Sequence, residues 1–119
     1  MKIREVEAGD VAALTLTGDL DQEAAEEIRT KVLPLLIEQD RVLLDFTGVG
    51  SVTEVGLRAM LLLYRYAKHV GARMALVGVS SEISDVLDAA GFLHFFVLAP
   101  DRVTAVAELG GRVLEGSDA

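Results

Sequence analysis

The sequence contains no cysteine and no tryptophan, and only 5% of its residues are aromatic. Without cysteine the chain forms no disulfide, no thiolate metal site and no cysteine nucleophile, which suits a reducing cytosol, so we expect a cytoplasmic location. Long hydrophobic runs are missing as well, because the nearly apolar run Ala59–Leu63 is far short of the roughly 20 residues that span a bilayer. The first ten residues are rich in charge, so we expect no secretion signal and no membrane association.

Positive charge is scarce too, since 11 Lys and Arg residues stand against 19 Asp and Glu residues, for a net charge of −8. This balance disfavours binding to a phosphate backbone, so we expect no nucleic-acid partner. A basic or mixed-charge protein partner fits better, although an acidic surface also simply keeps a domain soluble. We expect a monomer or a weak homodimer.

Residues that build active sites are few and scattered. The two histidines, His69 and His94, belong to no ligand pattern, so the sequence predicts no metal. A dinucleotide fingerprint would use Gly48 and Gly50, but its third glycine falls at Thr53, and no glycine-rich loop ending in lysine is present. We therefore predict no catalytic residue, no cofactor and no enzymatic activity.

Hydrophobic residues make up 51% of the 119 residues, which is enough for one substantial core. We predict a single domain over residues 1–115 and a disordered tail over residues 116–119. Strands alternate with helices, which predicts an α/β fold with an N-terminal antiparallel hairpin, further parallel strands and about four packed helices. The predicted strands are Ile3–Glu7, Val11–Thr17, Arg41–Phe46, Met74–Val79 and Phe95–Leu98.

Helix signals separate these strands. The predicted N-caps are Asp21, Thr53, and Ser80 or Ser81, the last helix is predicted to open after Pro100-Asp101, and the predicted stop residues are Gly71 and Gly91. Pro34 is expected to kink or loosen the first helix near its end. The apolar residues assigned to the inner faces of helices or to corner packing are Ile28, Val32, Leu35, Leu36, Ile83, Val86, Leu87, Phe92, Phe95, Phe96, Val103, Val106, Leu109 and Val113.

The segment Leu44–Arg58 reads as a buried strand that breaks at glycines and restarts as a helix, with Glu54 as its first helical residue. It resembles the central motif of the STAS family of anti-sigma factor antagonists, which reads Leu-Asp-aliphatic-Ser/Thr-Gly-Val and then Asp-Ser-Ser-Gly-Leu. Gly56 and Leu57 match that motif, whereas Thr53 replaces its Asp and Glu54 takes the place of its phosphorylated Ser. The loop Leu16–Asp21 and the corner Ala89–Phe92 resemble further family segments.

The resemblance implies a protein-interaction module in a bacterial partner-switching pathway. Its expected partner is an anti-sigma factor or related serine kinase, with a phosphatase upstream, and phosphate at the family's Ser blocks docking. The partner-binding residues implied by the motif and the neighbouring loop are Asp19, Asp21, Thr53, Glu54, Val55 and Arg58. Glu54 accepts no phosphate by that route, which leaves Thr53, and less so Ser51, as a hydroxyl for phosphorylation.

Glu54 itself allows more than one interpretation. An acidic residue in a first helical turn is stabilising by about 0.3–1 kcal/mol through the helix dipole, whatever its function. As a regulatory residue, it would fix the module in one state. A carboxylate carries one charge, against roughly −1.5 to −2 for a phosphoserine, so it imitates the blocked state poorly, or else the partner has a pocket that accepts it.

Two other classes of function stay open. A phosphoaspartate receiver would use Asp45 at the end of a central strand, with Asp19 and Asp21 nearby, but no lysine follows a late strand as that mechanism requires. A small-ligand or lipid-binding module would use an apolar groove near Met60 and Leu61, residues whose helical spacing is also typical of a core.

Overall fold

An antiparallel hairpin begins the chain in the computed structural model, which describes residues 1–110. Its strands are β1 (Lys2–Ala8) and β2 (Val11–Leu20), paired from Lys2 with Thr17 to Ala8 with Val11. The strands β3 (Arg41–Val52), β4 (Arg73–Val77) and β5 (Val97–Ala99) then add in parallel, so the sheet order is β1-β2-β3-β4-β5. The predicted fold class is confirmed.

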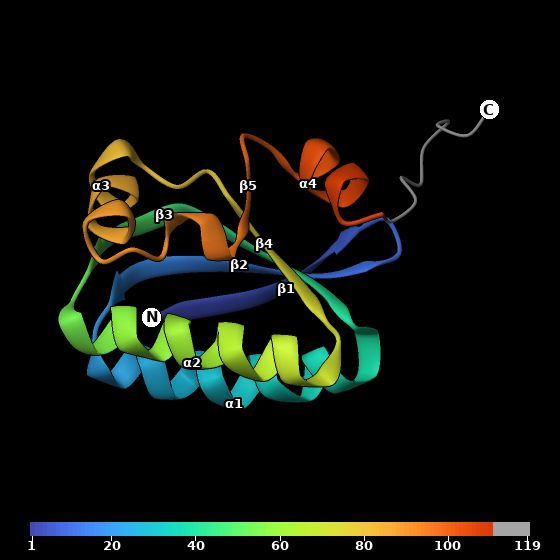
Figure 1. Ribbon diagram of the computed structural model, residues 1–119, viewed down its shortest axis with the longest axis horizontal. Coiled ribbons are helices and arrows are strands. Elements are labelled where there is room, and N and C mark those ends of the chain that lie inside the picture. The colour runs from blue at the N-terminus through green and yellow to red at the C-terminus, as the bar shows by residue number, and fades with distance from the viewer. Residues whose placement is uncertain (111–119) are drawn as a thin grey trace.

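Four α-helices cover this sheet within the described residues: α1 (Gln22–Gln39), α2 (Glu54–Val70), α3 (Ser81–Ala89) and α4 (Arg102–Glu108), with a short 3-10 helix η1 (Leu93–Phe95) before β5. Helices α1 and α2 lie side by side on one face of the sheet, and α4 lies on the other face (Figure 1). The α4 face is the smaller core, where Val106 and Leu109 pack with Leu43 and Ala75.

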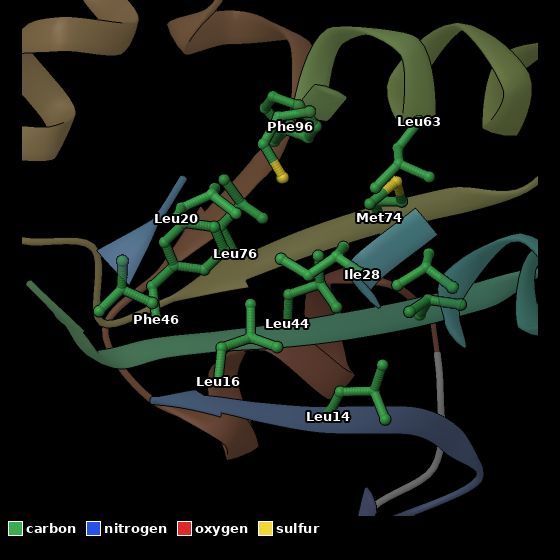
Figure 2. Packing of buried hydrophobic residues seen from close by; sticks show 14 of the residues in the cluster. Leu14, Leu16, Leu20, Ile28, Leu44, Phe46, Leu63, Met74, Leu76 and Phe96 are labelled. Carbon is green, nitrogen blue, oxygen red and sulfur yellow. The ribbon is translucent and has the colours of Figure 1, made fainter. Parts of the chain in front are cut away.

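The larger core lies between the sheet and helices α1 and α2. Alternate residues of the central strands point into it, including Leu16 of β2 and Leu44 of β3 (Figure 2). They meet Ile28 of α1 and Leu63 of α2, and all four side chains are at most 2% exposed. Burial of a leucine or isoleucine is worth about 1.5–3 kcal/mol, so this layer fixes how α2 sits on the sheet.

The helix ends follow local sequence chemistry. Asp21 caps α1 by accepting the N–H of Ala24 at 3.0 Å, and Ser80 caps α3 by accepting the N–H of Ile83 at 3.2 Å. Gly71 ends α2 with a φ of 77°, a left-handed conformation that glycine adopts without strain. These predictions are confirmed, but α1 continues beyond Pro34 to Gln39.

Strand β3 is longer than predicted, because it does not break at its glycines. It stays paired with β2 as far as Val52, with two register shifts along the way. A β-carbon on Gly48 would lie 2.9 Å from the carbonyl oxygen of Leu16, closer than real side chains come. Glycine here allows two backbones to approach, and it places Ser51 in a strand rather than in a loop.

Three residues assigned to the core are exposed. Val86 of α3 is 40% exposed, Val103 of α4 is 59% exposed and Phe95 of η1 is 38% exposed. Each lies on a short element at the periphery, where a helical pattern marks apolar residues but no neighbouring layer covers them. Phe95 stacks on Tyr64 instead, with ring centroids 4.6 Å apart, and β5 begins later than predicted. Val113 and the predicted tail over residues 116–119 lie outside the described residues.

Candidate functional site

The start of α2 is tied to the end of β2 by hydrogen bonds from one residue. Thr53 Oγ1 accepts the N–H of Gly56 at 3.1 Å, which is an N-cap bond, and also donates to the carbonyl of Leu20 at 3.2 Å. The backbone N–H of Thr53 donates to the same carbonyl at 3.0 Å. Phosphorylation of Thr53 would remove the proton that it donates to Leu20, so the hydroxyl has a structural role at this helix start.

Gly56 allows the first turn of α2 to rest directly on β2. A β-carbon at this position would overlap the carbonyl oxygen of Leu20 and lie 2.8 Å from Leu20 Cγ. The residue is buried, and the carbonyl belongs to backbone held in the sheet. The helix start is therefore fixed relative to the sheet by contact as well as by hydrogen bonds.

Glu54 points its charge into solvent from this fixed position. Its side chain is 86% exposed, and its carboxylate lies 3.7 Å from the guanidinium of Arg58, whose side chain is 68% exposed. Such an exposed pair one helical turn apart contributes only about 0.3–0.5 kcal/mol. Both groups are consequently free to exchange this weak pair for contacts with a partner.

The acidic segment before α1 was predicted as a loop, but its Asp19 lies in β2, which stays paired with β3 as far as Leu20, beside the same helix start. Asp19 is exposed, and its Oδ1 lies 3.0 Å from where a β-carbon on Gly50 would stand, next to the end of β3. The following pair, Leu20 with Val52, leads directly into Thr53. The structure thus brings Asp19 close to the start of α2, whereas Asp21 faces α1 as its N-cap.

A second apolar row runs along α2 beside its buried face. The buried row is Gly56, Met60, Leu63 and Ala67. One residue before each of these stands the row that we call the outer stripe: Val55, Ala59, Leu62 and Tyr66. With residues of α1 such as Leu33, the outer stripe lines a groove of about 380 Å³. Val55 is 44% exposed and Leu62 is 53% exposed.

Charged residues border this groove on both helices. On α1, Arg29 Nη2 donates to both carboxylate oxygens of Glu26 at 2.8 and 3.1 Å, and on α2 Arg58 lies near Glu54. Apolar side chains with a charged rim are the usual composition of a protein-binding surface. The groove predicted near Met60 and Leu61 is wrong in its residues: Met60 is 1% exposed in the core, and Leu61 is partly buried.

A buried carboxylate on the other side of the sheet escaped prediction as a structural group. Asp45 Oδ1 accepts the N–H and the hydroxyl of Thr47 at 2.9 and 2.6 Å. Asp45 Oδ2 accepts Nε and Nη2 of Arg102 at 3.2 and 3.1 Å, and Arg102 also donates to the hydroxyl of Thr15 at 3.3 Å. This network joins β2, β3 and α4.

Burial of Asp45 acts to raise the pKa of its carboxyl group. The hydrogen bonds from Thr47 and Arg102, together with the charge of Arg102, outweigh that effect and hold the pKa below its ordinary value. All of these partners bind the carboxylate from within the domain, so it is not free to accept a phosphoryl group as a receiver's aspartate does. Asp45 was predicted at the end of a central strand, but β3 continues to Val52 and the residue lies within it. No linear motif connects residues 45 and 102.

Residues 1–110 hold no group of three or more histidine, cysteine or acidic residues positioned to bind a metal ion. In the same residues, none of the helices combines the length and the apolar character needed to cross a bilayer.

Comparison with known proteins places this geometry in context. The model of the STAS domain matches residues 2–105. BtrV from Bordetella bronchiseptica, which carries the name of an anti-sigma factor antagonist, is 26% identical over 93 residues, covering 77% of this chain and 80% of BtrV.

Solved structures share the fold at lower identity. The unphosphorylated anti-sigma factor antagonist SpoIIAA of Bacillus has a TM-score of 0.74 at 19% identity, covering 92% of this chain and 97% of that one. A serine-to-glutamate variant of RsbS from Moorella thermoacetica has a TM-score of 0.77 at 17% identity, covering 92% and 96%. At these identities the likeness concerns the fold alone.

Proposed function

The chain belongs to the STAS domain family, and on that premise we propose that it is a non-enzymatic regulatory module of the anti-sigma factor antagonist type. Its partner would be an anti-sigma factor or a related serine kinase within a partner-switching pathway. The contact surface would combine the start of α2, at Thr53, Glu54 and Val55, with Arg58 and the end of β2 at Asp19. The names of BtrV and SpoIIAA support this class of partner.

One observation carries the proposal: an exposed carboxylate stands on a rigid helix start at the end of an exposed apolar stripe. Thr53 and Gly56 fix the first turn of α2 on β2, so a change at Glu54 alters the surface without altering the fold. Val55 is the first residue of the outer stripe, which continues away from Glu54 along the groove. Charge can then decide docking while apolar contact supplies affinity.

We propose further that Glu54 removes phosphorylation control at this position and holds the module in one state. A carboxylate cannot accept a phosphoryl group by the route open to serine, and Thr53 is engaged as a cap. The relative SpoIIAA exists in unphosphorylated and phosphorylated forms. In this chain a permanent single charge would replace that alternation.

Replacing Glu54 by lysine is the direct test. With the full chain as bait in native lysate, we expect wild type to retain a kinase-like anti-sigma protein and Glu54→Lys to bind it at least tenfold more weakly, because a close charge pair at an interface is worth about 1.5 kcal/mol or more. Mass spectrometry identifies the partner, and calorimetry with the purified partner measures the affinities. Glu54→Ser and Glu54→Ala run in parallel.

The matched control is Glu82→Lys, since Glu82 is likewise an exposed glutamate in the first turn of a helix, capped by Ser80. Equal binding by wild type and Glu82→Lys places the effect at α2. If Glu54→Ser binds and wild type does not, Glu54 holds the non-binding state. Equal affinity of all Glu54 variants for the same partner would contradict a role for this residue.

The outer stripe gives a second prediction. Leu62→Glu puts a charge in the middle of the groove. We expect a loss of partner affinity of about tenfold, because the variant lacks the apolar area that Leu62 would bury on docking. Val103→Glu is the control, since Val103 is about as exposed but lies on α4, on the other face of the sheet. Both variants should unfold thermally near the wild-type temperature. Equal losses for both would mean that general acidity, not the groove, weakens binding.

A further inference from the structure

Basic side chains gather in a second hollow, at the end of α2 opposite Glu54. This hollow, of about 260 Å³, is lined by Lys68 near the end of α2, Arg73 at the start of β4 and His94 of η1. The described residues that line it include no aspartate or glutamate. In a chain with a net charge of −8, a hollow lined by three basic side chains and no carboxylate departs from the general surface.

These basic groups form no ion pair with carboxylates among the described residues. Elsewhere in the described residues, arginines 29, 41, 58 and 102 each face a carboxylate. The side chains of Arg73 and His94, like that of Arg65, have no hydrogen-bond or ion-pair partner among residues 1–110, and what sets Arg73 and His94 apart is that they line the same hollow. Lys68 Nζ lies 5.9 Å from the centroid of the Tyr64 ring, a contact that positions the ammonium group and leaves its charge unneutralised.

The helix dipole explains only part of this arrangement. A lysine in the last turn of α2 is expected, because a helix C-terminus favours cations. Two of the last carbonyls of α2 already have partners, since those of Ala67 and Lys68 accept the N–H groups of Ala72 and Gly71 at 2.7 and 3.3 Å. Arg73 and His94 lie outside the helix, so the dipole gives no reason for them to converge on the same hollow.

The remaining lining residues are aliphatic or aromatic. Ala67, Ala72, Met74 and Phe96 are each at most 8% exposed and form the inner wall of the hollow. A ligand that matches both parts carries an anionic group for the basic rim and a small apolar body for the wall. The planar guanidinium of arginine suits phosphate oxygens, with lysine supplying a point charge and histidine a further donor. The volume lies just below the usual lower limit of about 300 Å³ for ligand pockets, which restricts the body to a small one.

We propose that this hollow binds a small organic phosphate monoester through Lys68, Arg73 and His94. The site lies away from Glu54, so it stands apart from the proposed partner surface and does not depend on it. The same monoester chemistry occurs in a free metabolite and in the headgroup of phosphatidic acid, and the experiment separates the two sources.

The test is a titration of the ¹⁵N-labelled full chain, followed by amide chemical shifts. Phenyl phosphate supplies both parts of the ligand, inorganic phosphate supplies only the anion and phenol supplies only the apolar body. We expect saturable shifts around residues 68, 73 and 94, with phenyl phosphate bound more tightly than either fragment. Lys68→Met and Arg73→Gln should each weaken binding roughly tenfold, the effect of losing one charge-assisted hydrogen bond.

Arg65→Gln is the matched control, because Arg65 is an exposed arginine on α2 that does not line the hollow. An equal loss with Arg65→Gln, or shifts spread over all basic residues, would mean general attraction of anions and would overturn the site. The absence of saturable shifts would overturn it as well. Flotation with phosphatidylcholine vesicles, with and without phosphatidic acid, then assigns the source: binding lost with Arg73→Gln but kept with Arg65→Gln supports a lipid headgroup as the ligand.

Discussion

Gly56→Ala is expected to lower the free energy of unfolding by about 2–3 kcal/mol, the cost of forcing an extra carbon into a packed site. The expectation runs against helix propensity, since alanine in place of glycine inside a helix is ordinarily stabilising by about 1 kcal/mol. The new β-carbon would overlap the carbonyl oxygen of Leu20, and that oxygen already accepts two hydrogen bonds from Thr53. Backbone in the sheet cannot rotate away as a flexible side chain can. Urea unfolding followed by circular dichroism measures the loss.

Ala59→Gly is the companion variant, because Ala59 lies on the same helix but faces the groove rather than the sheet. It should follow propensity alone and cost about 1 kcal/mol. A Gly56→Ala protein as stable as wild type, or more so, would show that α2 does not rest on β2 as described. The extra carbon should also shift the first turn of α2, which carries Glu54 and Val55. Gly56→Ala should therefore weaken partner binding in the fraction that folds.

Much of the fold could be predicted because its signals are local. The side chains of Asp21, Thr53 and Ser80 accept N–H groups a few residues away. Gly71 adopts the left-handed conformation that ends α2 without strain. Such interactions are the same in almost any tertiary context. They place the helix ends, and the helix ends in turn divide the apolar runs into strands.

Predictions failed where the outcome depended on distant neighbours. The glycines of β3 indicated a break, yet Gly48 permits close approach to β2, whose Leu16 lies far away in sequence. Val86 and Val103 have the spacing of core residues, but short peripheral helices leave them uncovered. A pattern identifies which residues share a face of a helix, and only the packing decides whether another layer covers that face.

The candidate site shows the same division. Thr53 and Glu54 could be placed at a helix start from the sequence, because capping is local. The contact of Gly56 with Leu20 and the pairing of Asp45 with Arg102 join residues far apart in the chain. The spacing of residues in the sequence therefore does not predict either contact. The outer stripe is a second row of apolar residues in the sequence, but its exposure depends on how α1 and α2 pack side by side.

Asp45→Asn is expected to lower the free energy of unfolding at pH 7 by about 2 kcal/mol, the cost of losing charge-assisted hydrogen bonds in a mostly buried site. The variant keeps the shape of the side chain, and its amide oxygen can still accept from Thr47. Its NH₂ group, however, meets the N–H groups of Arg102, so donors face donors where a carboxylate oxygen accepted two bonds. The anchor between β3 and α4 is thereby weakened.

The loss of stability in Asp45→Asn should depend on pH. Because the pKa of Asp45 is lowered in the folded state from its ordinary value of 3.8, the carboxylate contributes stability that is complete well above pH 3.8 and is lost as the pH falls through the folded-state pKa. Protonated Asp45 resembles asparagine, so the stability gap between wild type and Asp45→Asn should be widest near pH 7 and shrink below about pH 4. Urea titrations at pH 7, 5, 4 and 3 measure that gap.

A double-mutant cycle with Arg102→Gln isolates the pair from the other carboxylates that titrate in the same range. If Asp45 acts through Arg102, the two single losses overlap, and the double variant is less destabilised than their sum. Full additivity, or a gap that stays constant from pH 7 to pH 3, would contradict the pairing. A gap that closes on acidification while the cycle shows coupling would establish that one buried carboxylate, on the face of the sheet opposite the proposed partner surface, holds α4 against β3. In that case the start of α2 can change partners through its exposed charge without disturbing the packing on the other side of the sheet.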